Sequence, residues 1–159
     1  MNSYSREELR KAQLEDVNIG RVMTWIENDQ HPSNNELWLS GPETKSLWLC
    51  RDMLSIRQGI LYYRREGVVP TWCLVVPERY RAEVLKCCHD DRLSGHLGQT
   101  KTLERVKDTF FWYGMSKQVT DYVKTCASCN KNKKPTTWPK AALGMYHAGI
   151  PLELVHIDI

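Results

Sequence analysis

The chain has 159 residues, a formal net charge of +3 and 42% hydrophobic residues, among them 6 Trp and 7 Tyr. This length suits one compact domain or a small domain with an attached module, and the composition excludes an intrinsically disordered chain. No apolar run approaches the roughly 20 residues that cross a bilayer, and the N-terminal sequence lacks the apolar core of a signal peptide. We therefore expect a soluble, intracellular protein.

The charges are distributed unevenly along the chain. Residues 1–50 hold 5 basic and 8 acidic side chains, whereas residues 101–140 hold 9 basic and 3 acidic ones. This asymmetry points to a polyanion near the C-terminal half. A solvated helix face followed by a lysine-rich linker would give the same pattern, so charge alone leaves both interpretations open.

The first predicted element is a helix over residues 5–28. Ser5 and Glu8 have the spacing of a capping box, in which each side chain satisfies a free backbone amide at the helix start. Gly20 is the expected weak point, so the helix is either bent or split in two. Residues 28–35 (NDQHPSNN) predict a turn, because Asn, Asp, Ser and Pro favour local backbone hydrogen bonds.

A short helix from Pro42 leads into three β-prone runs, at residues 53–57, 60–65 and 71–76. Gln58-Gly59 predicts a hairpin turn, and Glu66-Gly67 predicts a second turn. The three strands would form a small antiparallel sheet whose apolar face needs a cover, and the helix over residues 5–28 is available. Residues 1–76 are therefore predicted to form a helix-plus-antiparallel-sheet module.

Three short helices are predicted over residues 77–135. Pro77 opens the first, which ends at His89; the second covers residues 100–111; Ser116 caps the third, which runs to Cys126. Residues 136–159 read as a linker that ends in a β-strand, LELVHIDI. The predicted fold class is α+β, with the sheet module followed by a metal-stabilised three-helix domain.

The strongest candidate site consists of His89, His96, Cys126 and Cys129. Two imidazoles and two thiolates are ligands that zinc prefers, and a Cys-x-x-Cys pair lets both sulfurs converge on one ion. Four protein ligands leave no open position for water or substrate, so this zinc would be structural rather than catalytic. Three short helices bury little apolar surface, so we expect the metal to supply much of the domain's stability.

Other interpretations of these residues stay open at this point. Cys126 and Cys129 could form a redox pair, although such pairs belong at the start of a helix and here a helix is predicted to end. The two histidines could be ordinary surface residues. The other four cysteines are expected to be core or incidental residues, namely Cys50, Cys73, Cys87 and Cys88.

Residues 89–133 resemble the His-His-Cys-Cys zinc-binding domain of retroviral and gypsy-type LTR-retrotransposon integrases. The motifs that carry the resemblance are GHLG around His96, KT at 101–102, FFWYGM at 110–115 and YVKTCASC at 122–129. Upstream, residues 5–27 are similar to the N-terminal extension of gypsy-type integrases. Downstream, PLELVHIDI resembles the first strand of the integrase catalytic core, with Asp158 at the position of its first catalytic carboxylate.

The resemblance implies a parent enzyme that joins element DNA to host DNA with two divalent ions, Mg2+ or Mn2+, held by three carboxylates. Only Asp158 is of that type here, and one carboxylate cannot hold two metal ions. We expect this chain to be inactive as an enzyme, with residues 1–76 as the extension, 77–135 as the zinc domain, and 136–159 as a linker with the first strand of a truncated core.

The resemblance also implies binding to double-stranded DNA, both element ends and host target, and assembly into integrase multimers, in the nucleus or in a cytoplasmic particle. Candidate phosphate contacts are Lys101, Arg105, Lys131, Lys133 and Lys134. Lys101 and Arg105 could instead merely keep the outer helix face solvated. We expect Trp112 to be a core residue and make no assignment for Trp138.

A second functional hypothesis is an integrase-derived protein-interaction or oligomerisation module without integration activity. A third is an enzyme acting through Cys126 and Cys129, which would require a reactive thiolate in metal-free protein. The sequence does not separate an active element from a domesticated host protein.

Overall fold

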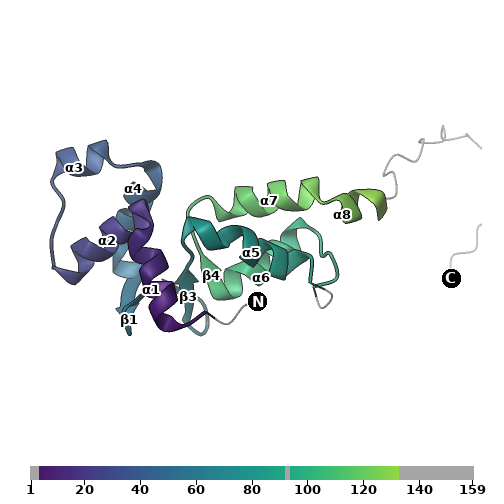
Figure 1. Ribbon diagram of the computed structural model, residues 1–159, viewed down its shortest axis with the longest axis horizontal. Helices are drawn as coiled ribbons and strands as arrows, with labels where there is room; N and C mark the ends of the chain where they lie inside the picture. The colour runs from purple at the N-terminus through teal and green to yellow at the C-terminus, as the bar shows by residue number, and fades with distance from the viewer. Residues whose placement is uncertain (1–3, 92–93, 133–159) are drawn as a thin grey trace, which may run out of the picture.

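The computed structural model describes residues 4–91 and 94–132 (Figure 1). This part of the chain contains eight α-helices and a four-stranded sheet, so the predicted α+β class is confirmed. None of the helices in this part of the chain has the length and hydrophobicity of a membrane span. The predicted linker and strand over residues 136–159 lie outside the described residues.

The first predicted helix is two helices, α1 (Arg6–Glu15) and α2 (Val17–Glu27). The capping box of Ser5 and Glu8 is present as predicted. The break falls at Asp16 rather than at Gly20, because the Asp16 carboxylate accepts hydrogen bonds from two backbone amides of the first turn of α2. Gly20 lies inside α2, where a Cβ atom would sit 2.4 Å from the Leu14 carbonyl oxygen. Glycine thus permits α1 and α2 to approach closely.

The predicted turn over residues 28–35 is correct only as far as Ser33. Ser33 and Glu36 form a second capping box, which starts the short helix α3 (Asn34–Leu39). Helix α4 (Pro42–Leu49) follows, with Pro42 at its first position. A single 3-10 turn, η1 (Arg51–Met53), leads from α4 into the sheet.

The sheet has the strand order β1 (Leu54–Arg57), β2 (Ile60–Arg65), β3 (Thr71–Val75) and β4 (Phe110–Phe111). The hairpin between β1 and β2 is confirmed, with positive φ at both Gln58 (51°) and Gly59 (78°). The fourth strand was not predicted. It pairs parallel to β3, with Leu74 opposite Phe110, so the prediction of a helix through residue 111 was wrong at its end.

Four helices, rather than the predicted three, follow β3: α5 (Glu78–His89), α6 (Gln99–Thr109), α7 (Met115–Thr125) and α8 (Ala127–Asn132). Pro77 is the N-cap of α5 rather than its first helical residue. The predicted cap at Ser116 was also wrong, because α7 begins at Met115 and its N-cap is Gly114, at a φ of 74°.

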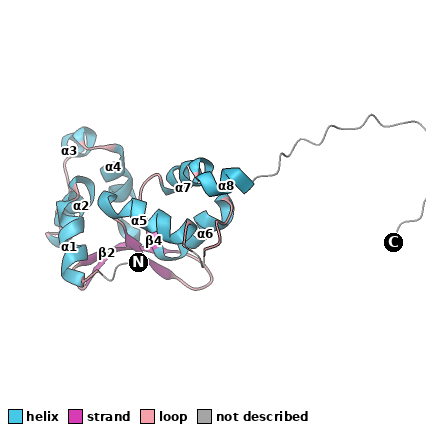
Figure 2. Ribbon diagram, turned by 45° about the vertical axis from the view of Figure 1, so that its right-hand side comes forward, coloured by secondary structure: helices cyan, strands magenta, loops and turns pink. Residues whose placement is uncertain are grey.

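Most of the buried apolar side chains form two clusters. One joins α2 and α4 to the sheet through residues such as Ile19, Leu47 and Leu61. The other joins α5, α6 and α7, and includes Phe110 of β4 and the predicted core residue Trp112, which is 2% exposed. Figure 2 shows the two groups of helices side by side, α1–α4 in one and α5–α8 in the other.

Polar contacts between α5 and the N-terminal helices connect the two groups. The backbone N–H of Glu78 donates to Asp16 Oδ2 at 2.9 Å, and Arg79 pairs with Glu15 at 2.6 Å. Arg81 pairs with Glu43 in a largely buried contact. The start of α5 is therefore fixed against the first, second and fourth helices.

Candidate metal centre

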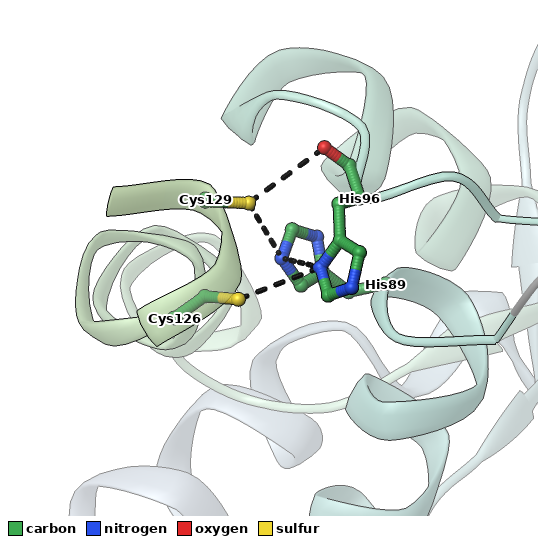
Figure 3. A group of neighbouring side chains, drawn as sticks. All are labelled: His89, His96, Cys126 and Cys129. Carbon is green, nitrogen blue, oxygen red and sulfur yellow. Dashed lines mark hydrogen bonds between the residues drawn. The ribbon is translucent and has the colours of Figure 1, made fainter. Parts of the chain in front are cut away.

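Four side chains from two segments that are distant in the sequence converge on one point (Figure 3). His89 is the last residue of α5, His96 lies in the loop before α6, Cys126 directly follows α7, and Cys129 lies in α8. One ligand atom from each lies within 4.8 Å of the other three. The structure thus brings together the four residues that the sequence singled out.

Three of the distances between the ligand atoms fit a tetrahedral ion. His89 Nε2 lies 3.3 Å from Cys129 Sγ, His96 Nδ1 lies 3.4 Å from Cys126 Sγ, and the two nitrogens are 3.4 Å apart. A zinc ion with its usual bond lengths, about 2.0 Å to nitrogen and 2.3 Å to sulfur, separates its ligand atoms by about 3.3 to 3.8 Å. These three distances suit zinc, whereas the ligand atoms that are farthest apart, within 4.8 Å of each other, would have to approach by about 1 Å.

The two cysteines lie where α7 ends and α8 begins. α7 ends before Cys126, as expected, and the backbone N–H of Asn130 then donates to the Cys126 carbonyl at 3.0 Å to start a further helical turn. This turn brings the Cys129 sulfur to the same side as that of Cys126 (Figure 3). The sequence reasoning missed α8, whose residues ASCNKN show no apolar periodicity.

The two histidines are held together by the backbone. Gly95 and His96 both have positive φ, 59° and 50°, and this reversal lets the His96 N–H donate to the His89 carbonyl at 3.2 Å. The Ser94 hydroxyl also donates to the Cys87 carbonyl at 2.8 Å. The loop is thus fastened to the end of α5, with both imidazoles facing one point.

The electrostatic surroundings favour the neutral form of His89. Its side chain is fully buried, and burial lowers the pKa of His89 below its ordinary value, although the neighbouring Asp90 carboxylate opposes this shift. The Tyr122 hydroxyl donates to Asp90 Oδ2 at 2.6 Å, and burial together with this carboxylate raises the pKa of Tyr122. A neutral imidazole is the form that binds a metal ion.

Two residues that the sequence did not indicate, Thr102 and Asp90, lie next to the histidines of the cluster. Thr102, fully buried in α6, lies 3.3 Å from His89 Nδ1 through its hydroxyl oxygen. Asp90 Oδ1 lies 3.9 Å from His96 Nδ1. Thr102 appeared in the sequence only as part of the KT pair of the resemblance, because its contact with His89 exists only in the folded chain.

The other predicted site residues lie apart from this cluster. Lys101 and Arg105 are exposed on α6, and Lys131 is exposed on α8. Lys133, Lys134, Trp138 and Asp158 lie outside the described residues. The remaining four cysteines are not part of the cluster either; Cys73 and Cys88 are buried, and Cys50 and Cys87 are partly exposed.

Comparison with known proteins agrees with this geometry. Residues 76–135 match the family described as integrase zinc binding domain. The chain is 42% identical over 50 residues, 31% of its length, to the retrovirus-related Pol polyprotein from transposon 412 of Drosophila melanogaster. It is 27% identical over 73 residues, 46% of its length, to gypsy retrotransposon integrase-like protein 1 of Macaca fascicularis.

An uncharacterized protein of Caenorhabditis elegans aligns with 99% of the chain at 24% identity. No solved structure matches the chain. The chain spans 4%, 11% and 14% of the lengths of these three relatives. Residues 76–135 are therefore similar to the integrase zinc binding domain, and the relatives of the chain include a retrotransposon Pol polyprotein and a gypsy integrase-like protein.

Proposed function

We propose that the chain binds one structural zinc ion through His89, His96, Cys126 and Cys129, and that residues 77–135 use this scaffold to contact element-end DNA and support assembly of an integrase multimer. The observation that carries the proposal is the closed cluster of two nitrogens and two sulfurs. Four protein ligands complete a tetrahedron, so the ion holds the fold together and does not itself activate water or substrate.

The metal would supply stability that the helices lack. None of the described residues in the loop of His96 or in α8 is a buried member of the apolar cluster, whose buried members lie in α5, α6, α7, β4 and the segments next to β3 and β4. Zinc would connect this loop and α8 to the end of α5. Binding free energy of a structural zinc site is in large part folding free energy, so these segments are expected to depend on the ion.

Two basic side chains on α6 support the DNA-binding part of the proposal. Lys101 and Arg105 are one helical turn apart and exposed, and neither forms an ion pair with another described residue. Glu104 and Asp108 are exposed on the same helix, which reduces the positive potential there. We therefore expect weak, sequence-independent phosphate contacts from this helix, to which Lys131 of α8 could add.

The test is binding of the zinc-loaded chain to short DNA duplexes of two unrelated sequences over a range of salt concentrations. Log affinity decreases linearly with log salt, and each phosphate contact that is lost should make this decrease shallower by about 0.9. Lys101→Gln and Arg105→Gln should each show this effect. Lys11→Gln, which removes an exposed charge from α1, is the matched control and should leave the slope unchanged. Absence of binding at low salt, or an unchanged slope in the double variant, would refute the role in DNA contact.

A second candidate function is protein interaction without integration activity. The observation that favours it is the exposure of Trp38 and Leu39 on α3, 77% and 78%, because large apolar side chains at a surface often mark a protein contact. A zinc-loaded chain that forms oligomers but does not bind duplex DNA would support this function over the first. Trp38→Ala should then shift the sedimentation of the chain toward the monomer.

A further inference from the structure

The His89 ring uses both of its nitrogens. Nε2 faces Cys129 Sγ and His96 Nδ1, and Nδ1 faces the hydroxyl of Thr102 at 3.3 Å. Both His89 and Thr102 are fully buried. The ring therefore lies between the proposed metal position and a threonine, with no access to solvent.

The hydroxyl of Thr102 has one proton, and that proton has another acceptor. Thr102 Oγ1 donates to the Leu97 carbonyl at 2.9 Å. Toward His89 the oxygen can then offer only a lone pair, so the facing Nδ1 must carry the hydrogen.

A neutral imidazole carries a single ring proton. If Nδ1 holds it, Nε2 presents a lone pair, and Nε2 is the nitrogen that faces both the Cys129 sulfur and the other histidine. The opposite tautomer would place an N–H toward the metal and leave the Thr102 oxygen facing an unprotonated nitrogen. Thr102 thus selects the tautomer that can bind a cation.

We infer that Thr102 is a positioning residue of the metal centre, which fixes the tautomer and the ring orientation of His89 before the ion arrives. The inference rests on the proposed zinc function. The same hydroxyl links the two histidine segments, because its acceptor, Leu97, directly follows His96. The His96 side chain is 36% exposed and is therefore less restricted. We infer preorganisation for His89 and not for His96.

The experiment compares zinc affinities of three variants by competition with a chromophoric chelator. Thr102→Val keeps the side-chain shape but removes the hydroxyl, Thr102→Ser keeps the hydroxyl, and Thr109→Val changes an exposed threonine of the same helix. Thr102→Val should bind zinc roughly 10- to 100-fold more weakly than the wild type, as expected for loss of a partner behind a metal ligand. Thr102→Ser and Thr109→Val should stay within about threefold of the wild type.

A second measurement does not depend on whether a variant folds. Long-range proton–nitrogen correlation spectra of the wild-type, zinc-loaded chain should show His89 protonated at Nδ1 and bound to the ion through Nε2. Binding through Nδ1 would overturn the inference, as would wild-type affinity in Thr102→Val. Failure of the wild type to bind zinc at all would instead refute the proposed function, which separates the two outcomes.

Discussion

The carboxylate of Asp16 accepts a hydrogen bond from the backbone N–H of Glu78, at 2.9 Å and 62 residues further along the chain. Its other oxygen caps α2 through the N–H groups of Asn18 and Ile19, at 3.0 and 3.1 Å. One carboxylate therefore satisfies free amides at the starts of two helices, α2 and α5. It connects the N-terminal helices to the helix that ends in His89.

Replacement of Asp16 should destabilise the chain more than loss of an ordinary helix cap. Asp16→Ala removes three hydrogen bonds to backbone amides, and we expect it to lower the free energy of unfolding by about 2 kcal/mol. The measurement is urea denaturation of the zinc-loaded chain. Asp52→Ala is the control, because the Asp52 side chain is 85% exposed and its ion pair with Arg51 is long, at 4.0 Å. Equal stability of the two variants would contradict the expectation.

Gln13 is expected to be sensitive to substitution although it is polar and distant from the metal centre. Its side-chain amide is fully buried, donates to the carbonyls of Leu61 and Val75, and accepts from the Leu61 N–H. Gln13→Leu would leave these three strand groups unpaired, at a cost of about 2 to 4 kcal/mol in unfolding free energy. Gln30→Leu, at an exposed position, should change stability by less than about 0.5 kcal/mol, and a similar loss in both variants would argue against this role.

Gly20 provides a test of the close approach between α1 and α2. Alanine normally stabilises a helix interior by about 1 kcal/mol over glycine, so a simple propensity argument predicts a gain. A Cβ atom at Gly20 would lie 2.4 Å from the Leu14 carbonyl oxygen, so we expect Gly20→Ala to lower the melting temperature instead. Gly67→Ala, whose Cβ would meet nothing closer than 3.7 Å, is the matched control. A higher melting temperature for Gly20→Ala would show that the helices separate easily.

Removal of the metal tests the proposed domain boundary at residue 76. Chelation of zinc should abolish amide-exchange protection in α8 and in the loop of His96, and weaken it in α6 and α7. The hairpin of β1 and β2 belongs to the other apolar cluster, so its protection should persist. Simultaneous loss of protection in the hairpin would show that the described chain unfolds as one cooperative unit rather than as two domains.

The candidate site could be predicted from the sequence because residue types and short spacings identify its ligands. Two histidines and a Cys-x-x-Cys pair are uncommon residue types at recognisable spacing, and the resemblance rests on short motifs around them. Thr102 carries no such signal, because threonine is common in helices and its contact with His89 depends on how α6 packs against α5. Chemistry of the ligands was predictable, whereas their supporting contacts were not.

The sequence predicted most of the helices and strands, but it did not predict the strand β4 or the position of the first helix break. The hairpin at Gln58-Gly59 and the capping box at Ser5 follow from residue types within a few positions of each other. The two-residue strand β4 was missed because its pairing with β3 joins residues 74 and 110, and nothing local distinguishes Phe110 from the end of a helix. The sequence analysis placed the weak point of the first helix at Gly20, whereas the break lies at Asp16, whose carboxylate caps α2.

The most direct test of the proposed zinc centre is the metal content of the purified chain beside that of two cysteine variants. The wild type should contain one zinc per chain. Cys126→Ser should lose the zinc together with the folded α8, whereas Cys87→Ser, at a cysteine outside the cluster, should retain both. A wild-type chain without zinc, or a Cys126→Ser variant that keeps one zinc per chain with wild-type affinity, would contradict the four-ligand assignment.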